Sequence, residues 1–181
     1  MKKFLISFLG ILLVLTTGCD QIDNNPTKQV EDLMSKYQTL DDDVMDDLNT
    51  VVDTEKDLSD EQKNRYKKLL ENQYKNLSYT IKDETIDGDN AIVEVEIQVT
   101  DLSKAMAESE IYLDEHEEEF LDDNNQFSQS KYTDYKLEKL ESANTKVKYT
   151  LELTLTKIND EWEVDNLTET ERQKIHGIYN Y

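Results

Sequence analysis

The spacing of apolar residues changes along the chain, and this change limits the folds that the chain can adopt. As far as Leu77, apolar residues recur every three or four positions, the spacing of amphipathic helices. Segments 91–99 (AIVEVEIQV) and 147–155 (VKYTLELTL) alternate instead. Alternation of apolar with mostly polar residues predicts antiparallel strands that have one buried face and one wet face. Helices before, between and after such strands predict an α+β fold.

Three amphipathic helices are expected before the first strand, over residues 26–37, 40–52 and 59–77. Asn25 followed by Pro26 suits a helix start, with Asn as the cap and Pro at the first helical position. Ser59 with Gln62 three residues later has the spacing of a capping box.

Two hairpins and three further helices complete the expected elements. Asp87-Gly88 predicts the turn into the first alternating strand, and Asn159-Asp160 predicts the turn from the second into a short strand containing Trp162. Trp162 is expected to be buried where this hairpin meets the sheet. Helices are expected over residues 102–120 and 132–140, and after the capping-box pair Thr168 and Glu171.

The amino terminus has the parts of an export signal. Lys2 and Lys3 precede an unbroken apolar run, Phe4 to Leu15, and small residues follow. The run is shorter than the ~20 residues that a membrane-spanning helix needs. Cys19 is the only cysteine of the chain, so the exported domain has no internal disulfide.

Residues 1–19, ending in Thr16-Thr17-Gly18-Cys19, resemble a bacterial lipoprotein signal. The resemblance implies that residues 1–18 are cleaved, that Cys19 is acylated with a diacylglyceryl group and becomes the mature amino terminus, and that the protein is anchored to the extracytoplasmic face of the cell membrane. Two acyl chains suffice for stable anchoring, whereas one does not. Thr16 stands where such signals usually carry Leu. The alternative is an ordinary secretory signal in which Cys19 is incidental.

The remaining chain is expected to form a short tether over residues 19–26 and a single domain over residues 27–181. The formal net charge is −21, and cleavage of the signal would also remove Lys2 and Lys3. Such an excess of acid excludes nucleic acid as an expected partner, because binding a phosphate backbone needs a basic face. It also argues against the domain lying flat on anionic lipid.

The order of elements in residues 27–181 resembles the nuclear-transport-factor-like, or cystatin-like, fold of many small Gram-positive lipoproteins. The residues that carry this resemblance are the Asp-Gly hairpin before Ala91-Ile92-Val93-Glu94-Val95 and the turn from 146–158 into Trp162-Glu163-Val164. The resemblance implies a cone of curved antiparallel sheet closed by helices, with helices inserted between the two hairpins and a concave pocket. It implies no particular activity.

Aromatic residues are the candidates for lining that pocket. Ten tyrosines are present, and Tyr79, Tyr112, Tyr149 and Trp162 lie in or beside the predicted strands and crossing helices. Such side chains could bind a ring or a sugar, or donate a proton to an oxyanion. The alternative is that they pack in the core.

No motif identifies a metal, cofactor or catalytic site, and none is expected. The acidic run Asp41–Asp43 with Asp46 and Asp47 is interpreted as a solvated helix face, because acids along a helix point apart. His116 is interpreted as a helix-boundary residue, since His-Glu alone is not the two-histidine zinc motif.

These observations predict a membrane-anchored extracytoplasmic binding or accessory domain, whose partner is a small ligand or another envelope protein. One alternative is a pocket enzyme that performs acid–base chemistry on a small organic substrate. The other is a purely structural envelope protein. A pocket behind the apolar strand faces would favour the binding domain or the enzyme, whereas a filled core with an exposed apolar patch would favour the structural alternative, in which the outer face of the protein meets a partner.

Overall fold

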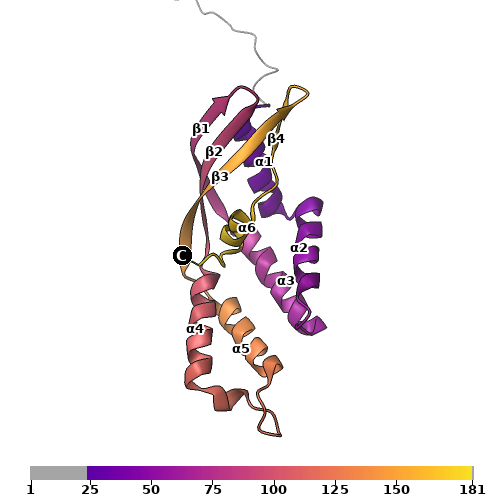
Figure 1. Ribbon diagram of the computed structural model, residues 1–181, viewed down its shortest axis with the longest axis vertical. Coiled ribbons are helices and arrows are strands. Elements are labelled where there is room, and N and C mark those ends of the chain that lie inside the picture. Colours follow the sequence, from indigo (N-terminus) through magenta and orange to yellow (C-terminus); the bar gives the residue numbers. More distant parts are fainter. Residues whose placement is uncertain (1–23, 181) are drawn as a thin grey trace, which may run out of the picture.

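The computed structural model describes residues 24–180, and its elements follow the predicted order (Figure 1). Three helices precede a hairpin, two helices are inserted before a second hairpin, and a short helix follows. In chain order the elements are α1 (Pro26–Thr39), α2 (Asp42–Thr54), α3 (Asp60–Lys75), β1 (Ser78–Asp87), β2 (Asn90–Thr100), α4 (Leu102–Glu115), the 3-10 helix η1 (Glu117–Phe120), α5 (Gln129–Ser142), β3 (Lys146–Ile158), β4 (Glu161–Val164) and α6 (Glu169–His176). The predicted α+β class is confirmed.

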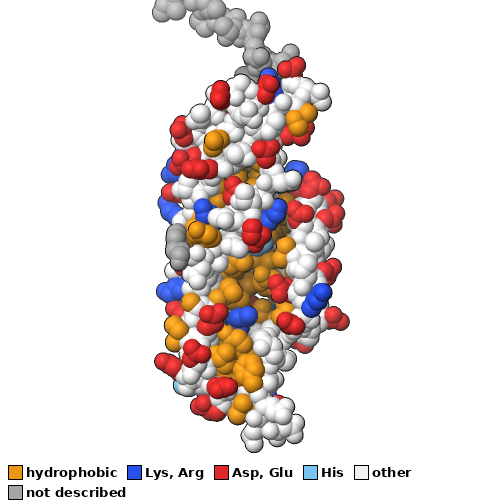
Figure 2. All heavy atoms as spheres, in the orientation of Figure 1, with side chains coloured by type: hydrophobic (Ala, Val, Ile, Leu, Met, Phe, Trp, Pro, Cys, Tyr) orange, Lys and Arg blue, Asp and Glu red, His pale blue; other side chains and the backbone are white. Residues whose placement is uncertain are grey.

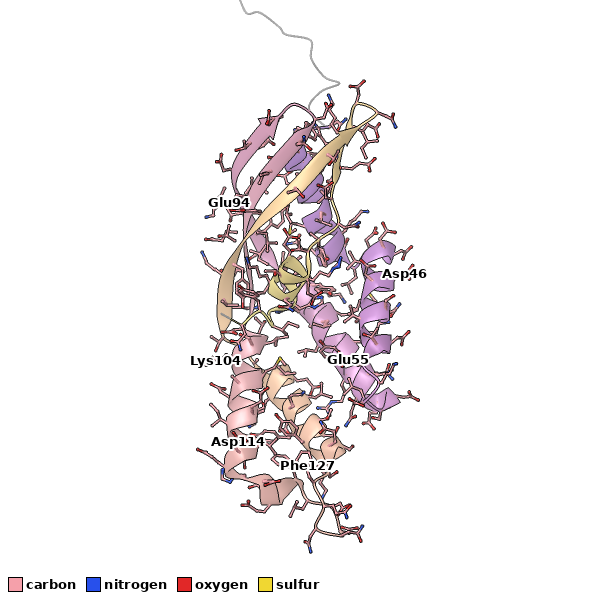
Figure 3. All side chains as sticks on the ribbon, in the orientation of Figure 1. Asp46, Glu55, Glu94, Lys104, Asp114 and Phe127 are labelled. Carbon is pink, nitrogen blue, oxygen red and sulfur yellow. The ribbon has the colours of Figure 1, made fainter. Side chains whose placement is uncertain are left out.

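The four strands form one antiparallel sheet in the order β1-β2-β3-β4. In the central pair, Val95 lies opposite Leu151 and Ile97 lies opposite Tyr149. Residues that face each other in this way share one face of the sheet, and these four are at most 3% exposed. The opposite face carries polar side chains such as Glu94 (Figure 3). The predicted alternation between a buried and a wet face is confirmed.

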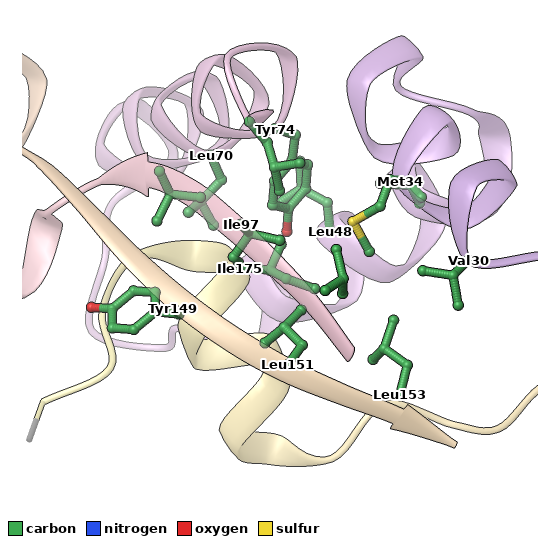
Figure 4. Close-up of a cluster of buried hydrophobic side chains, with 14 of the residues drawn as sticks. Val30, Met34, Leu48, Leu70, Tyr74, Ile97, Tyr149, Leu151, Leu153 and Ile175 are labelled. Carbon is green, nitrogen blue, oxygen red and sulfur yellow. The ribbon is translucent and has the colours of Figure 1, made fainter. Parts of the chain in front are cut away.

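Side chains from α1, α2, α3 and α6 fill the apolar face of the sheet (Figure 4). Val30, Met34, Leu48, Leu70 and Ile175 are at most 1% exposed. A side chain without accessible surface leaves no room beside it for a water molecule. The concave pocket implied by the fold resemblance is therefore replaced by packed core at these residues, because the helices lie close enough to bury the whole face.

The helix starts that were expected from capping patterns are confirmed. The Asn25 side chain accepts a hydrogen bond from the Lys28 amide at 2.7 Å, and Pro26 stands at the start of α1. Both capping boxes form, with Ser59 paired to Gln62 and Thr168 paired to Glu171. Each cap satisfies amide groups that the first turn of a helix leaves unpaired.

Both predicted hairpin turns are present. Asn159 and Asp160 have φ values of 53° and 68°, the backbone of a type I′ turn, whose twist matches that of the flanking strands. Gly88 supplies the positive φ, 61°, of the β1–β2 turn. Trp162 follows the second turn and is 8% exposed, so its predicted burial is confirmed.

The α4–α5 helical hairpin leaves the sheet between β2 and β3 and forms the end of the elongated molecule opposite the start of α1 (Figure 1). One continuous helix was expected over residues 102–120. It instead ends at Glu115, and η1 follows. Glutamates at 117–119 disfavour a continued helix, because negative charge at a helix carboxyl end opposes its dipole. His116 caps this end, at a helix boundary as predicted. Within residues 24–180 no helix is long and apolar enough to span a membrane.

Candidate functional site

Two hollows lie beside α2 and α3. The first is bordered by α1, α2, α3, α6 and residues 164–167, and the second by α3, α4, α5, Ile178 and the α2–α3 loop. We call them together the helical groove. The α2–α6 hollow has a volume of about 630 Å³, and its walls include Leu33, Tyr37, Val44, Leu48, Val51, Tyr74, Leu167 and His176. The α3–α5 hollow has a volume of about 220 Å³, and its walls include Leu58, Tyr66, Met106, Leu137 and Ile178.

The two hollows are neighbours along the same elements. Val51 of α2 lines the first hollow, and Glu55, which caps the carboxyl end of α2, lines the second. On α3, Tyr74 lines the first hollow and Tyr66 lines the second. Apolar side chains gather in this hollowed region of the surface in Figure 2. A depression that combines apolar walls with charged rims is typical of a binding surface.

A hydrogen-bonded tyrosine–histidine pair forms the base of the α2–α6 hollow. Tyr74 Oη and His176 Nε2 lie 2.7 Å apart, and the two residues are 2% and 8% exposed. Burial lowers the pKa of His176 to about 4 and raises the pKa of Tyr74. Tyr37 packs edge-on against Tyr74 at a centroid distance of 5.0 Å, and burial raises its pKa to about 12. All three rings are therefore uncharged at neutral pH.

The carboxyl end of α6 is held in place by Gln73 of α3. Its side-chain amide donates to the backbone oxygens of Thr100 at 2.8 Å and His176 at 3.0 Å, and its carbonyl accepts from the Thr100 amide. Gly177 ends α6 with φ 74°, beside the Thr100 carbonyl. The Ser103 amide in α4 donates to the Gly177 oxygen. These bonds join α3, α6 and the base of the helical hairpin into one unit beside the groove.

The rims of the groove carry more acid than base. Asp43, Asp47 and Glu55 line it from α2, and Asp165 and Glu169 line it from the other side. The lining cations are Lys36, Lys136 and Arg172. Lys36 already pairs with Asp43 at 3.0 Å, an exposed pair. The α2 rim is therefore negative, whereas the opposite rim carries two acids and two cations.

The four aromatic residues predicted to line a pocket do not meet at one site. Tyr79 of β1 and Tyr149 of β3 are the register partners of Ile97 in β2. The Tyr149 hydroxyl donates a hydrogen bond to the Tyr179 carbonyl. Trp162 lies in β4, far along β3 from Tyr149. None of these three borders the groove.

Tyr112 belongs to the α4–α5 hairpin. It stacks on Tyr135 at a centroid distance of 4.8 Å and lies 4.2 Å from the ring of His116, and its hydroxyl donates to Glu119. These contacts make Tyr112 part of the aromatic packing of the hairpin, far from the other three predicted residues.

The acidic run of α2 is exposed, in agreement with a solvated helix face. Asp41 caps the helix by accepting from the Asp43 amide, and Asp46 and Glu55 lie at its surface (Figure 3). Within residues 24–180 no group of three His, Cys, Asp or Glu side chains is arranged to hold a metal ion. Cys19, the predicted lipidation site, lies outside the described residues.

The sequence prediction missed Tyr37, Tyr74 and His176 as neighbours. Tyr37 and Tyr74 lie in the helices that were expected over residues 26–37 and 59–77. His176 lies in the helix that was expected after Thr168 and Glu171. A histidine on the apolar side of the last helix was the available signal, but its contact with Tyr74, 102 residues earlier, is created by the docking of α6.

Comparison with protein-family models, with curated proteins and with solved structures finds no match for this chain.

Proposed function

We propose that the protein is a lipid-anchored extracytoplasmic binding domain that holds a polypeptide segment of an envelope partner in the helical groove. The observation that carries this proposal is the contrast between the two apolar surfaces of the molecule. The face of the sheet is filled, with Val93, Val95 and Ile97 at 0% exposure, whereas the groove remains open to solvent along α2 and α3.

The walls of the groove support a polypeptide partner. Leu58, Tyr66 and Met106 are partly exposed there although they are apolar or amphipathic. Leaving such side chains in water costs free energy that a bound partner recovers, at about 25 cal/mol per Å² of apolar area. Tyr and Met are also enriched at protein interfaces.

The position of the predicted anchor is compatible with this role. The described chain begins at one end of the elongated molecule, and the groove opens along its side (Figures 1 and 2). A domain attached through Cys19 and a short tether would keep the groove accessible to envelope proteins. The anchor has its own test: Cys19→Ser should move the protein from the membrane fraction to the soluble fraction. Retention in the membrane with an uncut signal would contradict the lipoprotein prediction.

The pocket-enzyme alternative has one observation in its favour, the Tyr74–His176 pair. The pair is almost fully buried and each member is the other's hydrogen-bond partner. Proton transfer to a substrate would require both to move. We therefore assign the pair a structural role at the base of the groove.

Site-specific photo-cross-linking tests the proposed function. p-Benzoylphenylalanine is introduced at Val51 or Leu58 in the groove, and at Ile92 or Ile158 as matched controls on the sheet, which are 45% and 46% exposed. After irradiation of intact cells, the groove positions should form a discrete adduct with an envelope protein, and the controls should not. Absence of adducts from the groove, or equal adducts from the sheet positions, would show that the groove is not the binding site.

A further inference from the structure

We infer that the occupant of the helical groove is a basic amphipathic helix of about three turns. This inference rests on the proposed function and adds the chemical class of the partner segment. Three properties of the groove lead to it: the kind of element that forms its walls, its length and the negative charge of its α2 rim.

Most residues that line the groove lie in helices; the others are Val164 at the end of β4 and the loop residues Glu55, Leu58, Asp165, Asn166, Leu167 and Ile178. Helices use their own backbone groups for internal hydrogen bonds. An extended segment laid in this groove would find few backbone partners and would leave its own amides and carbonyls unpaired, which is costly in a buried interface. A helical segment brings its hydrogen bonds with it and needs only an apolar face, as in other helix-in-groove complexes.

The groove follows α2 from Asp43 to the cap residue Glu55. At 1.5 Å per residue, this stretch is about 18 Å long and matches roughly three helical turns. Val51 and Leu58 provide partly buried apolar contacts along this line. The occupant therefore needs apolar residues that recur every three or four positions on one side.

The charge of the α2 rim selects a basic helix. Asp47 and Glu55 are exposed and form no ion pair with another residue of the 24–180 region. On the opposite rim Asp165 and Glu169 are balanced by Arg172 and Lys136. A helix with Lys or Arg beside its apolar face would place these cations against the α2 rim, whereas an acidic helix would be repelled there.

Synthetic peptides test this inference. The probes are an 18-residue Leu/Lys peptide with helical spacing, the same peptide with Glu in place of Lys, and a Leu/Lys peptide of equal composition with alternating order. Each is labelled with a fluorophore and titrated by anisotropy with the full chain purified in a neutral maltoside detergent, with detergent alone as the blank. The helical Leu/Lys peptide should bind at least tenfold more tightly than either of the others.

Two matched double variants distinguish the groove from general charge attraction. Asp47→Asn with Glu55→Gln removes two acids from the groove, and Asp89→Asn with Glu94→Gln removes two acids from the β1–β2 hairpin. The groove variant should weaken binding of the helical Leu/Lys peptide at least fivefold, and the sheet variant less than twofold. Circular dichroism checks that both variants are folded.

Equal affinities of the three peptides, or equal weakening by the two variants, would overturn the inference. If no peptide binds while Val51 and Leu58 still cross-link a partner in cells, the basic-helix inference fails and the proposed function remains. If those cross-links are absent as well, both fail.

Discussion

His176 shows how a single titratable residue is made part of the core. Its ring lies between α3 and the groove, bonded to Tyr74, and burial lowers its pKa from the ordinary 6.5 to about 4. Between these values the unfolded chain binds more protons than the folded chain. The stability that the neutral ring contributes is therefore complete above about pH 6.5 and is lost as the pH falls toward 4.

We expect His176→Gln to flatten the decline in stability between pH 6.5 and 4. The shift in pKa corresponds to roughly 3 kcal/mol of pH-dependent stability, and Gln keeps a polar group near Tyr74 without titrating in this range. Urea unfolding of both chains at several pH values measures the effect. If the free energy of unfolding of both chains falls in parallel with pH, His176 is not the titrating group. The carboxylates that both chains share would then cause the decline.

Two glycines with positive φ provide a matched pair. Gly177 has φ 74°, and an added Cβ would collide with the Thr100 carbonyl, whereas Gly88 has φ 61° and open space around it. Gly88→Ala should cost about 1–2 kcal/mol, the strain of a left-handed L-residue. Gly177→Ala should cost clearly more, because the contact of α6 with β2 must also open. Equal losses on chemical unfolding would contradict the close approach at Gly177.

At the scale of elements, the α4–α5 hairpin is an insertion into a continuous sheet. Thr100 at the end of β2 is the register partner of Lys146 at the start of β3. The Asp101 amide donates to the Thr145 carbonyl at 2.8 Å. Two strand ends this close are compatible with a tight turn.

Replacement of residues 101–145 by Asn-Gly should leave the sheet and the remaining helices folded. Loss of Leu102 and Leu140 from the core should lower the free energy of unfolding by at least about 4 kcal/mol, since each buried Leu that is lost costs ~2–5 kcal/mol. Cross-linking from Leu58 should disappear. Trp162, the single tryptophan, reports on the sheet by its fluorescence. In the control variant, Asn-Gly replaces Gly88-Asp89 in the β1–β2 turn, and the α4–α5 hairpin is kept. If the shortened chain shows no cooperative transition while the control does, the hairpin is required for folding.

At the scale of the whole molecule, the net charge of −21 dominates the surface. The ion pairs that the structure describes are largely exposed, as in Lys28–Asp32 and Lys104–Glu108. Such pairs contribute little individually. The uncompensated acids repel one another in the folded state, and salt screens this repulsion over roughly 8–10 Å.

Added sodium chloride should therefore raise the melting temperature. Calcium chloride at the same ionic strength should raise it to a similar extent, because the acids of α2 lie on an exposed helix face and act as separate charges. Differential scanning fluorimetry of the full chain in detergent measures both. A saturable, calcium-specific increase that is lost in Asp42→Asn or Asp46→Asn would contradict this interpretation.

The fold class, the strand alternation, the hairpin turns and the helix caps were all predictable, because each depends on residues that are close in sequence. Ala91 to Val99 alternate whatever packs on them, and Ser59 finds Gln62 within one helical turn. The boundary of α4 was predicted less well, since the charge of three glutamates competes with a continuing apolar pattern.

The candidate site depended on tertiary structure. Whether the apolar face of the sheet enclosed a cavity was decided by the distance at which the helices pack, and local patterns do not report that distance. Tyr79, Tyr112, Tyr149 and Trp162 shared only a residue type, so their positions diverged once the chain folded. The sequence alone determined which side chains are apolar and gain free energy when they are buried. The docking of α6 and of the helical hairpin on α3 decided which apolar surface stayed open. Contacts between distant segments determine where apolar surface is buried and where a groove remains.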